Sequence, residues 1–205
     1  MKAIHQQLKH IYDPPMLLYV LGKLPGALAE SLKSIAIVGT REASDYGLET
    51  SRRLAYDLAA QGVAVISGLA LGVDSKAHEG CLAAGGETVA VLETERQYHL
   101  PQRTISPLAK KITEQGGAVM SEYRIGTSPQ AHNFPGRNRI INGLARGVVV
   151  VEGSKRSGAM ITADYALKRG AAFSAFQGGL ATVNPEGTLN LLKQGAILLQ
   201  MPAIF

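Results

Sequence analysis

The fold is decided by residues 35–44, which read Ile-Ala-Ile-Val-Gly-Thr-Arg-Glu-Ala-Ser. The apolar run predicts a buried strand, and glycine then opens a loop into an amphipathic stretch over residues 48–61. The strand candidates cover residues 35–38, 63–66, 88–92, 118–120, 148–151, 172–176 and 196–199. Helical periodicity lies between most of them, as over residues 159–169. This alternation predicts an α/β fold with a doubly wound, mostly parallel, Rossmann-like sheet.

Glycines mark the ends of the predicted helices, at Gly62, Gly116–Gly117 and Gly170, where a left-handed residue ends a helix. Right-handed crossovers then place every strand-to-helix loop at one edge of the sheet. Residues 1–33 are interrupted by prolines and are expected to form an N-terminal extension that packs on the sheet edge. Residues 34–205 are expected to form one Rossmann-like domain.

The composition is that of a basic protein: 205 residues carry 21 Lys+Arg and 16 Asp+Glu, a formal net charge of +5. This charge suits a polyanion such as nucleic acid, and it is equally common in basic enzymes. The single cysteine, Cys81, excludes an internal disulfide, and no Cys/His cluster predicts a metal site. The apolar residues 16–21 are too few to cross a bilayer and no cleavage site follows them, so we interpret the protein as soluble and cytoplasmic.

Three strand-to-helix loops combine glycine with hydroxyl or charged groups. In the first, Gly39 and Thr40 bring the backbone close to a phosphate, the following helix offers amide donors, and Arg41 adds a guanidinium. The alternative is a tight turn with a surface arginine. In the third, over residues 152–158, an anion-binding nest is expected. Its members are Lys155, Arg156, Ser157 and Gly158, with Thr162 one turn later.

The second loop, residues 67–74, leads into a helix that carries His78. Ser67, Gly68 and Gly72 are assigned to phosphate binding in this loop. Asp74 is expected to cap the helix, with a partly exposed His78 on the same helical face. A catalytic acid/base pair is the other interpretation of these two residues.

The three loops together predict several phosphates in a row along one edge, although each alone also suits a mononucleotide or a sulfate. No GxGxxG or GxxxxGK[ST] sequence occurs, so neither a dinucleotide cofactor nor an NTPase is indicated, and no cofactor is predicted. No nucleophile elbow, HExxH or paired-carboxylate arrangement occurs either. The pattern therefore favours binding without turnover, and no catalytic residue is assigned.

A fourth segment, residues 132–144, predicts a helix that begins near Pro135 and turns an apolar stripe toward the sheet. The stripe consists of Ile140, Ile141 and Leu144. Arg137 and Arg139 point to different sides, so at most one meets the ligand while the other braces a neighbouring loop. Asn138 between them is assigned to the binding site. Phe134 either stacks on a base or packs onto its own helix as a hydrophobic staple.

Taken together, these segments resemble the DNA-processing protein A (DprA/Smf) family. The resemblance covers about residues 15–200 and includes Ile37–Arg41, Ser67–Asp74, Ser121–Tyr123, Asn133–Ile141 and Ser157–Ala163. It implies a Rossmann-like domain that binds single-stranded DNA, protects it and hands it to the RecA recombinase during natural transformation. It also implies a dimer formed through the same domain. The positions that match the family's DNA pocket are Arg41, Phe134, Arg137 and Arg139, with Ser157–Gly158 beside them.

The chain departs from the family pattern in two regions. Residues 98–103 read Tyr-His-Leu-Pro-Gln-Arg where many relatives carry Tyr-Pro-x-x-Asn. Residues 176–190 include Phe-Gln-Gly and Gly-Thr-Leu-Asn in place of Val-Pro-Gly and Gly-Thr-Asn, which reshapes one expected wall of the pocket.

Two alternatives share this fold class. One is a phosphoribohydrolase resembling the LOG-like enzymes, whose Pro-Gly-Gly-x-Gly-Thr loop is approached only by residues 185–188, without a glutamate near Asn190. The other is a nucleotide-sensing module that uses the same loops for a mononucleotide.

Overall fold

The computed structural model describes residues 8–26, 33–92, 106–123, 133–153, 158–168, 172–176 and 186–199. The strands in this part of the chain are β1 (Tyr19–Gly22), β2 (Ser34–Val38), β3 (Ala64–Ser67), β4 (Thr88–Leu92), β5 (Ala118–Ser121), β6 (Gly147–Val150), β7 (Ala172–Phe176) and β8 (Ile197–Leu199). The helices are α3 (Asp45–Ala60), α4 (Val73–Ala83), α5 (Pro107–Glu114), α6 (Asn133–Leu144), α7 (Gly158–Lys168) and α8 (Glu186–Lys193).

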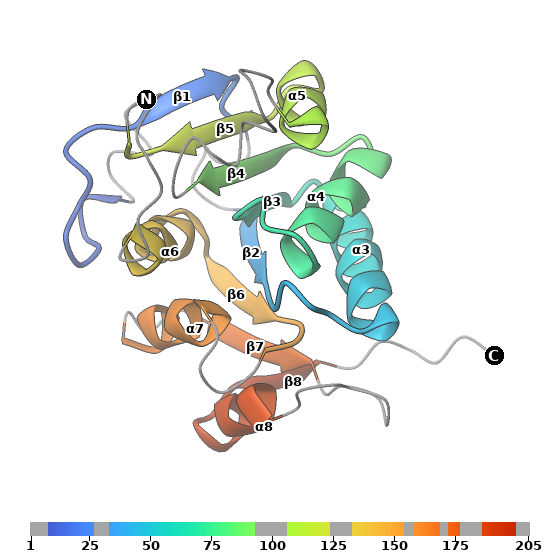
Figure 1. The fold of residues 1–205 in the computed structure, drawn as a ribbon, viewed down its shortest axis with the longest axis vertical. Helices are drawn as coiled ribbons and strands as arrows, with labels where there is room; N and C mark the ends of the chain where they lie inside the picture. Colours follow the sequence, from blue (N-terminus) through green and yellow to red (C-terminus); the bar gives the residue numbers. More distant parts are fainter. Residues whose placement is uncertain are drawn as a thin grey trace.

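The strands form one eight-stranded sheet in the order β1-β5-β4-β3-β2-β6-β7-β8 (Figure 1). All neighbouring pairs are parallel except β1 with β5. The prediction of a doubly wound, mostly parallel Rossmann-like sheet is confirmed, and each predicted strand lies within about one residue of the observed one. The sequence pattern missed β1, whose four residues are all exposed at the sheet edge.

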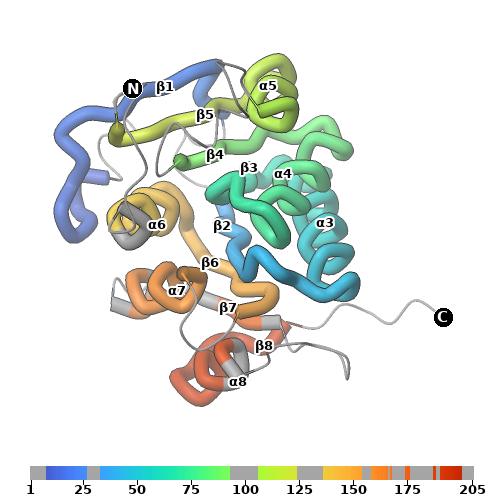
Figure 2. Tube along the Cα trace, in the orientation of Figure 1, coloured from blue at the N-terminus to red at the C-terminus, as the bar shows by residue number. Residues whose placement is uncertain are grey.

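Helices cover both faces of the sheet because its strands are apolar on both sides. Helices α3, α4 and α5 lie on one face and α6, α7 and α8 on the other (Figure 2). Along β2 the side chains alternate, so that Ile37 joins the core under α3 and α4 while Ala36 and Val38 join the core under α6 and α7.

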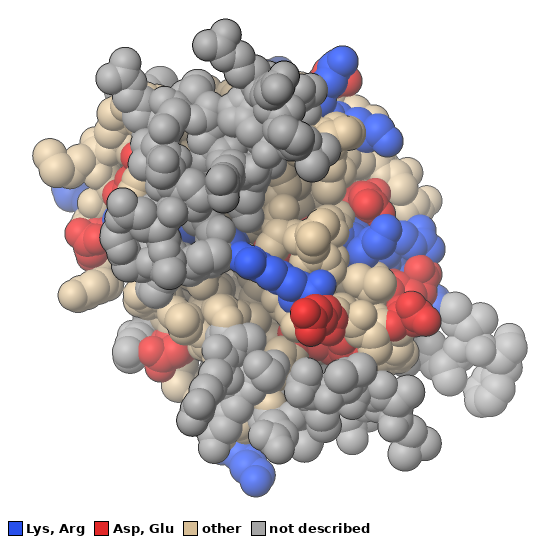
Figure 3. Space-filling view, viewed as in Figure 1, with Lys and Arg blue, Asp and Glu red and all other residues tan. Residues whose placement is uncertain are grey.

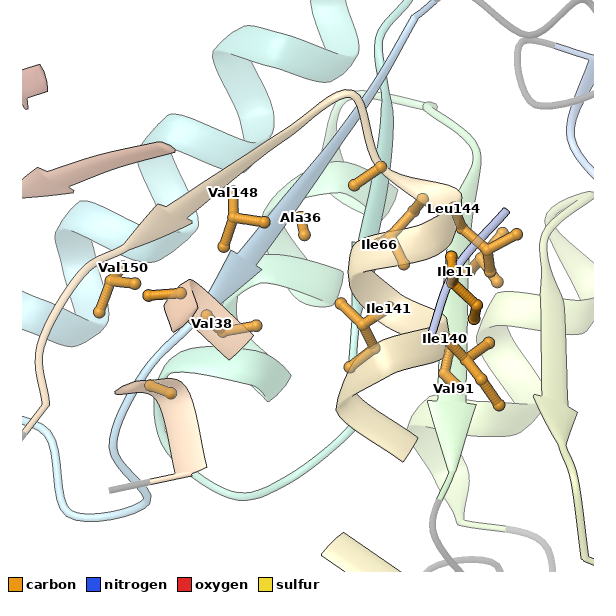
Figure 4. Packing of buried hydrophobic residues seen from close by; sticks show 14 of the residues in the cluster. Ile11, Ala36, Val38, Ile66, Val91, Ile140, Ile141, Leu144, Val148 and Val150 are labelled. Carbon is orange, nitrogen blue, oxygen red and sulfur yellow. The ribbon is translucent and has the colours of Figure 1, made fainter. Parts of the chain in front are cut away.

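The apolar stripe of α6 packs onto the sheet as predicted. Ile140, Ile141 and Leu144 are at most 1% exposed and contact strand residues such as Ile66 and Val91 (Figure 4). Full burial of such side chains contributes roughly 1.5–3 kcal/mol each. This packing fixes the orientation of α6, and therefore the directions of the polar side chains between its apolar residues.

The direction in which the chain adds strands to the sheet reverses between β2 and β6, which are parallel neighbours. From β2 the chain winds outward through β3, β4 and β5, and it then returns to the other side of β2 and winds outward through β6, β7 and β8. The loops that follow β2 and β6 therefore diverge, and ligands of such folds bind in the crevice between them. Gly62 and Gly116 end α3 and α5 with φ of 72° and 88°, as predicted, and Gly170 lies outside the described residues.

Within the described ranges, each helix is too short or too polar to span a bilayer.

Candidate nucleic-acid interface

A pocket of about 470 Å³ lies at the point where the loops after β2 and β6 diverge. Four parts of the fold form its wall: the loop after β2, the start of α4 with the loop before it, α6, and the start of α7. Its lining residues are Val38, Gly39, Thr40, Arg41, Glu42, Ala70, Asp74, Arg137, Asn138, Gly158, Ala159, Ile161 and Thr162. Seven of the residues assigned to phosphate binding from the sequence come together here: Gly39, Thr40, Arg41, Arg137, Asn138, Gly158 and Thr162.

Arg137 is held in the pocket wall by close packing against Gly68. Its side chain is 6% exposed, and a Cβ atom on Gly68 would overlap the guanidinium group. Nη1 of Arg137 lies 3.9 Å from Oδ2 of Asp74, which supplies the opposite charge. Gly68 is not among the described residues that line the pocket, but its lack of a side chain leaves the space that the Arg137 guanidinium occupies.

Side-chain hydrogen bonds join α6 to the beginning of α7. Nδ2 of Asn138 donates to the carbonyl oxygen of Gly158 at 3.1 Å, and Oγ1 of Thr162 donates to the same oxygen at 3.3 Å. The first-turn amides of a helix have no partner within the helix. Because Gly158 and Ala159 line the pocket, the positive end of α7 lies at its wall, where it favours an anion.

The beginning of α3 is arranged differently from the sequence-based expectation. Glu152, 3% exposed at the end of β6, accepts hydrogen bonds from the amide of Ser44 at 2.9 Å and from its hydroxyl at 2.5 Å. Oγ of Ser44 accepts from the amide of Gly47, and the amide of Thr40 donates to the carbonyl oxygen of Glu152. The prediction that this loop and helix start offer their amides to a ligand is wrong for these three donors, because a carboxylate, a hydroxyl and a carbonyl oxygen of the chain already occupy them.

The beginning of α4 also differs from expectation. Gly72 is the capping residue, with φ of 82°, and Asp74 lies inside the first turn, so the prediction of Asp74 as the helix cap is wrong. Asp74 is 5% exposed and accepts from the amide of Gly68 at 3.2 Å. Burial raises the pKa of Asp74, although Arg137 and the amides of Gly68, Ala70 and Gly39 act to lower it.

His78 is fully buried, which corrects the expectation of a partly exposed side chain. The hydroxyl of Thr88 donates to the carbonyl oxygen of Val65 at 2.7 Å, so it accepts the proton of Nδ1 of His78, also at 2.7 Å. This assigns the Nδ1–H tautomer and leaves Nε2 without a hydrogen bond. Burial, reinforced by Arg137, lowers the pKa of His78 to about 3. A buried neutral imidazole outside the pocket lining is unsuited to acid/base catalysis there.

We predict that His78 makes the protein sensitive to acid. Below pH 6.5 the unfolded chain binds a proton that the folded chain excludes until about pH 3, so stability falls as the pH falls through this window. The loss approaches roughly 1.4 kcal/mol per pH unit. Urea denaturation at pH 7.5 and pH 4.5 should show a larger loss in the wild type than in His78→Asn, by about 2–3 kcal/mol. Asp74 has a raised pKa and opposes this trend, but it is present in both proteins. Equal losses of stability in the wild type and in His78→Asn would show that His78 is not the source of the acid sensitivity.

Arg139 lies on the other side of α6 and forms a separate cluster. Its Nη1 and Nη2 atoms donate to the two carboxylate oxygens of Glu122, both at 2.8 Å, and Nε donates to the carbonyl oxygen of Asp13 at 2.7 Å. Burial acts to lower the pKa of Arg139, but Glu122 and Asp13 raise it overall. Arg139 therefore fastens the N-terminal segment and the end of β5 to α6, and it does not line the pocket.

The other residues assigned from the sequence are placed as follows. Ser67 is fully buried and donates to the carbonyl oxygen of Ile37 at 2.6 Å, so it joins β3 to β2. Gly72 packs closely against the backbone of Thr40 and Arg41. The side chain of Phe134 and all of Lys155, Arg156 and Ser157 lie outside the described residues.

Sequence reasoning did not assign to the binding site two carboxylates that shape it. Asp74 lines the pocket, and Glu152 holds the loop after β2. A signal for Glu152 existed in its position directly after a strand, but its partner Ser44 could be found only once β2 and β6 were known to be neighbours.

Charge on the visible face of the molecule is mixed. Figure 3 shows basic side chains near the centre of this face with acidic side chains beside them. The described part of this face is therefore not uniformly basic. Among the described residues, no group of three His, Cys, Asp or Glu side chains could hold a metal ion.

The segment closest to the LOG-like loop is residues 185–188, of which 186–188 are described. It includes the start of α8, and no residue of α8 is among the described residues that line the pocket. The nucleotide hydrolase interpretation therefore finds no support in the pocket geometry.

Comparison with known proteins agrees with the geometry. Protein Smf of Escherichia coli (strain K12) is 42% identical over 196 residues, which are 96% of this chain and 51% of that protein, so the chain spans about half the length of this curated relative. The X-ray structure of DNA processing protein A from Streptococcus pneumoniae matches with a TM-score of 0.80 and 34% identity, over 94% of this chain and 66% of that one.

A second solved structure, from Helicobacter pylori, matches with a TM-score of 0.79 and 30% identity, over 94% of this chain and 86% of that one. That structure concerns the single-stranded DNA binding mode of DNA processing protein A from Helicobacter pylori. The family model of DNA recombination-mediator protein A matches residues 2–204. This chain therefore belongs to the DprA/Smf family of DNA-processing, recombination-mediator proteins.

Proposed function

We propose that this chain binds single-stranded DNA, with a phosphate of the strand in the pocket between the loops after β2 and β6. The supporting observation is the convergence of Arg41, Arg137, Asn138 and the start of α7 on one pocket. Guanidinium groups and a helix N-terminus are the groups that hold phosphate oxygens in proteins. The single-stranded DNA binding described for the Helicobacter pylori relative supports the same ligand.

The arrangement supports one phosphate inside the pocket and others along its rim. The carboxylate and the carbonyl oxygen of Glu152 occupy the amides of Ser44 and Thr40 in the loop before α3. Asp74 occupies the amide of Gly68 before α4, whereas the start of α7 lines the pocket. Arg41 is exposed at the rim, where it suits a neighbouring phosphate. We further propose that Lys155, Arg156 and Ser157 extend this track and that Phe134 stacks on a base.

The fate of the bound strand and the partners of the protein are proposed from its family membership. We propose that the bound strand is protected and delivered to the RecA recombinase during natural transformation, in the cytoplasm, by a homodimer. We also propose that the protein acts without a cofactor and without cutting or modifying DNA. The supporting observation is membership of a recombination-mediator family.

The ligand class is tested by filter binding at one salt concentration with a single-stranded oligonucleotide, its duplex and nucleoside monophosphates. We expect the single strand to bind most tightly, because its backbone follows the rim and its bases are free to stack. Tighter binding of monophosphates than of the single strand would favour a nucleotide sensor or hydrolase and would contradict the proposal.

We predict that the affinity for single-stranded DNA falls with salt and that Arg41→Ala reduces the slope of log K against log salt by roughly one. Each phosphate neutralised by a cationic side chain releases condensed counterions. Removal of one such side chain therefore removes the counterion release at one phosphate. The measurement is a titration of fluorescent oligothymidylate at several NaCl concentrations. An unchanged slope would show that Arg41 does not contact a phosphate.

A further inference from the structure

The proposed DNA pocket contains a buried carboxylate in its own wall. Asp74 lines the pocket, is 5% exposed, and lies 3.9 Å from Nη1 of Arg137. Such a carboxylate repels the phosphates that Arg137 attracts. We infer that Asp74 determines specificity: it admits the singly charged phosphodiesters of a DNA strand and disfavours the doubly charged phosphomonoesters of free nucleotides. This inference rests on the proposed function of the pocket.

The charge balance of the described pocket lining supports the inference. Its charged side chains are Arg41, Glu42, Asp74 and Arg137, whose formal charges cancel when Asp74 is ionised. Burial raises the pKa of Asp74, whereas Arg137 and the amide of Gly68 favour its ionised form. Glu42 is exposed, so solvent and salt screen its charge, whereas Asp74 is buried and is screened much less. His78 lies on the same helix as Asp74, but its pKa of about 3 keeps it neutral near pH 7, so it adds no positive charge.

Asp74 is also fixed in place, so it cannot swing away from an incoming anion. It lies in the first turn of α4 and accepts the amide of Gly68 at 3.2 Å, and the loop that carries Gly68 packs against Arg137. One negative charge on a ligand is matched by Arg137 and the positive end of α7. A second charge meets Asp74, because the other cation among the described lining residues, Arg41, is exposed and its charge is screened by solvent.

The two kinds of phosphate differ by one charge above the second pKa of a phosphomonoester, which is about 6. At the effective dielectric constant of a protein site, one extra unit charge near a carboxylate changes affinity by roughly tenfold or more. We therefore expect the carboxylate to reverse the ordinary preference of a basic site for the more highly charged ligand.

The experiment compares thymidine 5′-monophosphate with its methyl ester, which differ by this charge and by one methyl group. Dissociation constants are measured by NMR titration at pH 8 and one salt concentration. The wild type should bind the methyl ester about tenfold more tightly. In Asp74→Asn this ratio should fall to about one or reverse. Glu79→Gln removes a charge from an exposed position on the same helix, outside the pocket, and should keep the wild-type ratio.

The ratio of the two dissociation constants separates an effect of charge from an effect of structure, because a disturbed loop weakens the binding of both ligands alike. An unchanged ratio in Asp74→Asn would overturn the inference. A wild type that prefers the monophosphate would also overturn it, and this result does not depend on whether the variant folds. Failure of the proposed function is a different result: oligothymidylate would not bind at all, whatever the ratio for the two small ligands.

Discussion

Gly68→Ala should weaken the binding of single-stranded oligonucleotides about as much as Arg137→Ala does, by roughly tenfold to a hundredfold. A Cβ atom at position 68 would occupy the space of the Arg137 guanidinium, so the arginine has to leave the pocket wall. A charge-assisted hydrogen bond to a phosphate is worth about 1.5–3 kcal/mol, which corresponds to this loss. The measurement is a titration of fluorescent oligothymidylate with each purified variant.

Because both changes act on the same guanidinium, the double variant should bind no more weakly than Arg137→Ala alone. Gly26→Ala is the matched control, since a Cβ atom there meets no atom within 4 Å. Thermal unfolding should show that Gly68→Ala remains folded, because the group that it displaces is the end of a flexible side chain. Full affinity in Gly68→Ala would show that Arg137 does not act from this position.

Arg139→Ala should lower the free energy of unfolding by about 2–3 kcal/mol and should change the affinity for single-stranded DNA by less than about twofold. Removing the arginine leaves the carboxylate of Glu122 and the carbonyl of Asp13 without their principal donor. The expected cost lies below that of a fully buried pair, because Glu122 is 24% exposed. Urea denaturation measures the stability and oligonucleotide titration the affinity.

Arg52→Ala is the matched control for this second prediction. Arg52 forms a similar pair with Glu49, but both side chains are exposed, so we expect no measurable loss of stability. A variant of Arg139 that keeps its stability and loses DNA binding would show that this arginine belongs to the binding surface after all.

Most of the fold could be predicted from the sequence, because apolar runs and helical periodicity are local features. The strand at Thr88–Leu92 and the apolar stripe at Ile140, Ile141 and Leu144 are examples. Strand β1 could not be predicted in the same way. Its residues are exposed, and its position depends on pairing with β5, a segment far along the chain, as in the pair of Val20 with Met120.

The residues of the candidate site could largely be predicted from the sequence, but the hydrogen bonds between them could not. Glycine-rich loops after parallel strands converge by topology, which brought Gly39, Arg41 and Gly158 to one pocket. Whether a helix start is open to a ligand depends on side chains from distant parts of the chain. Glu152 reaches Ser44 because β6 lies beside β2, and no local pattern in the sequence reports that contact.

The central claim is that the pocket between the loops after β2 and β6 receives the DNA strand, and its most direct test is an NMR titration with oligothymidylate of protein labelled on its backbone amides. The amides of Gly39, Arg41, Asn138, Gly158 and Thr162 should shift most, since these residues line the pocket, while those of Glu79 and Lys111, which line another surface, should stay in place. Saturable shifts confined to residues outside this pocket would contradict the account.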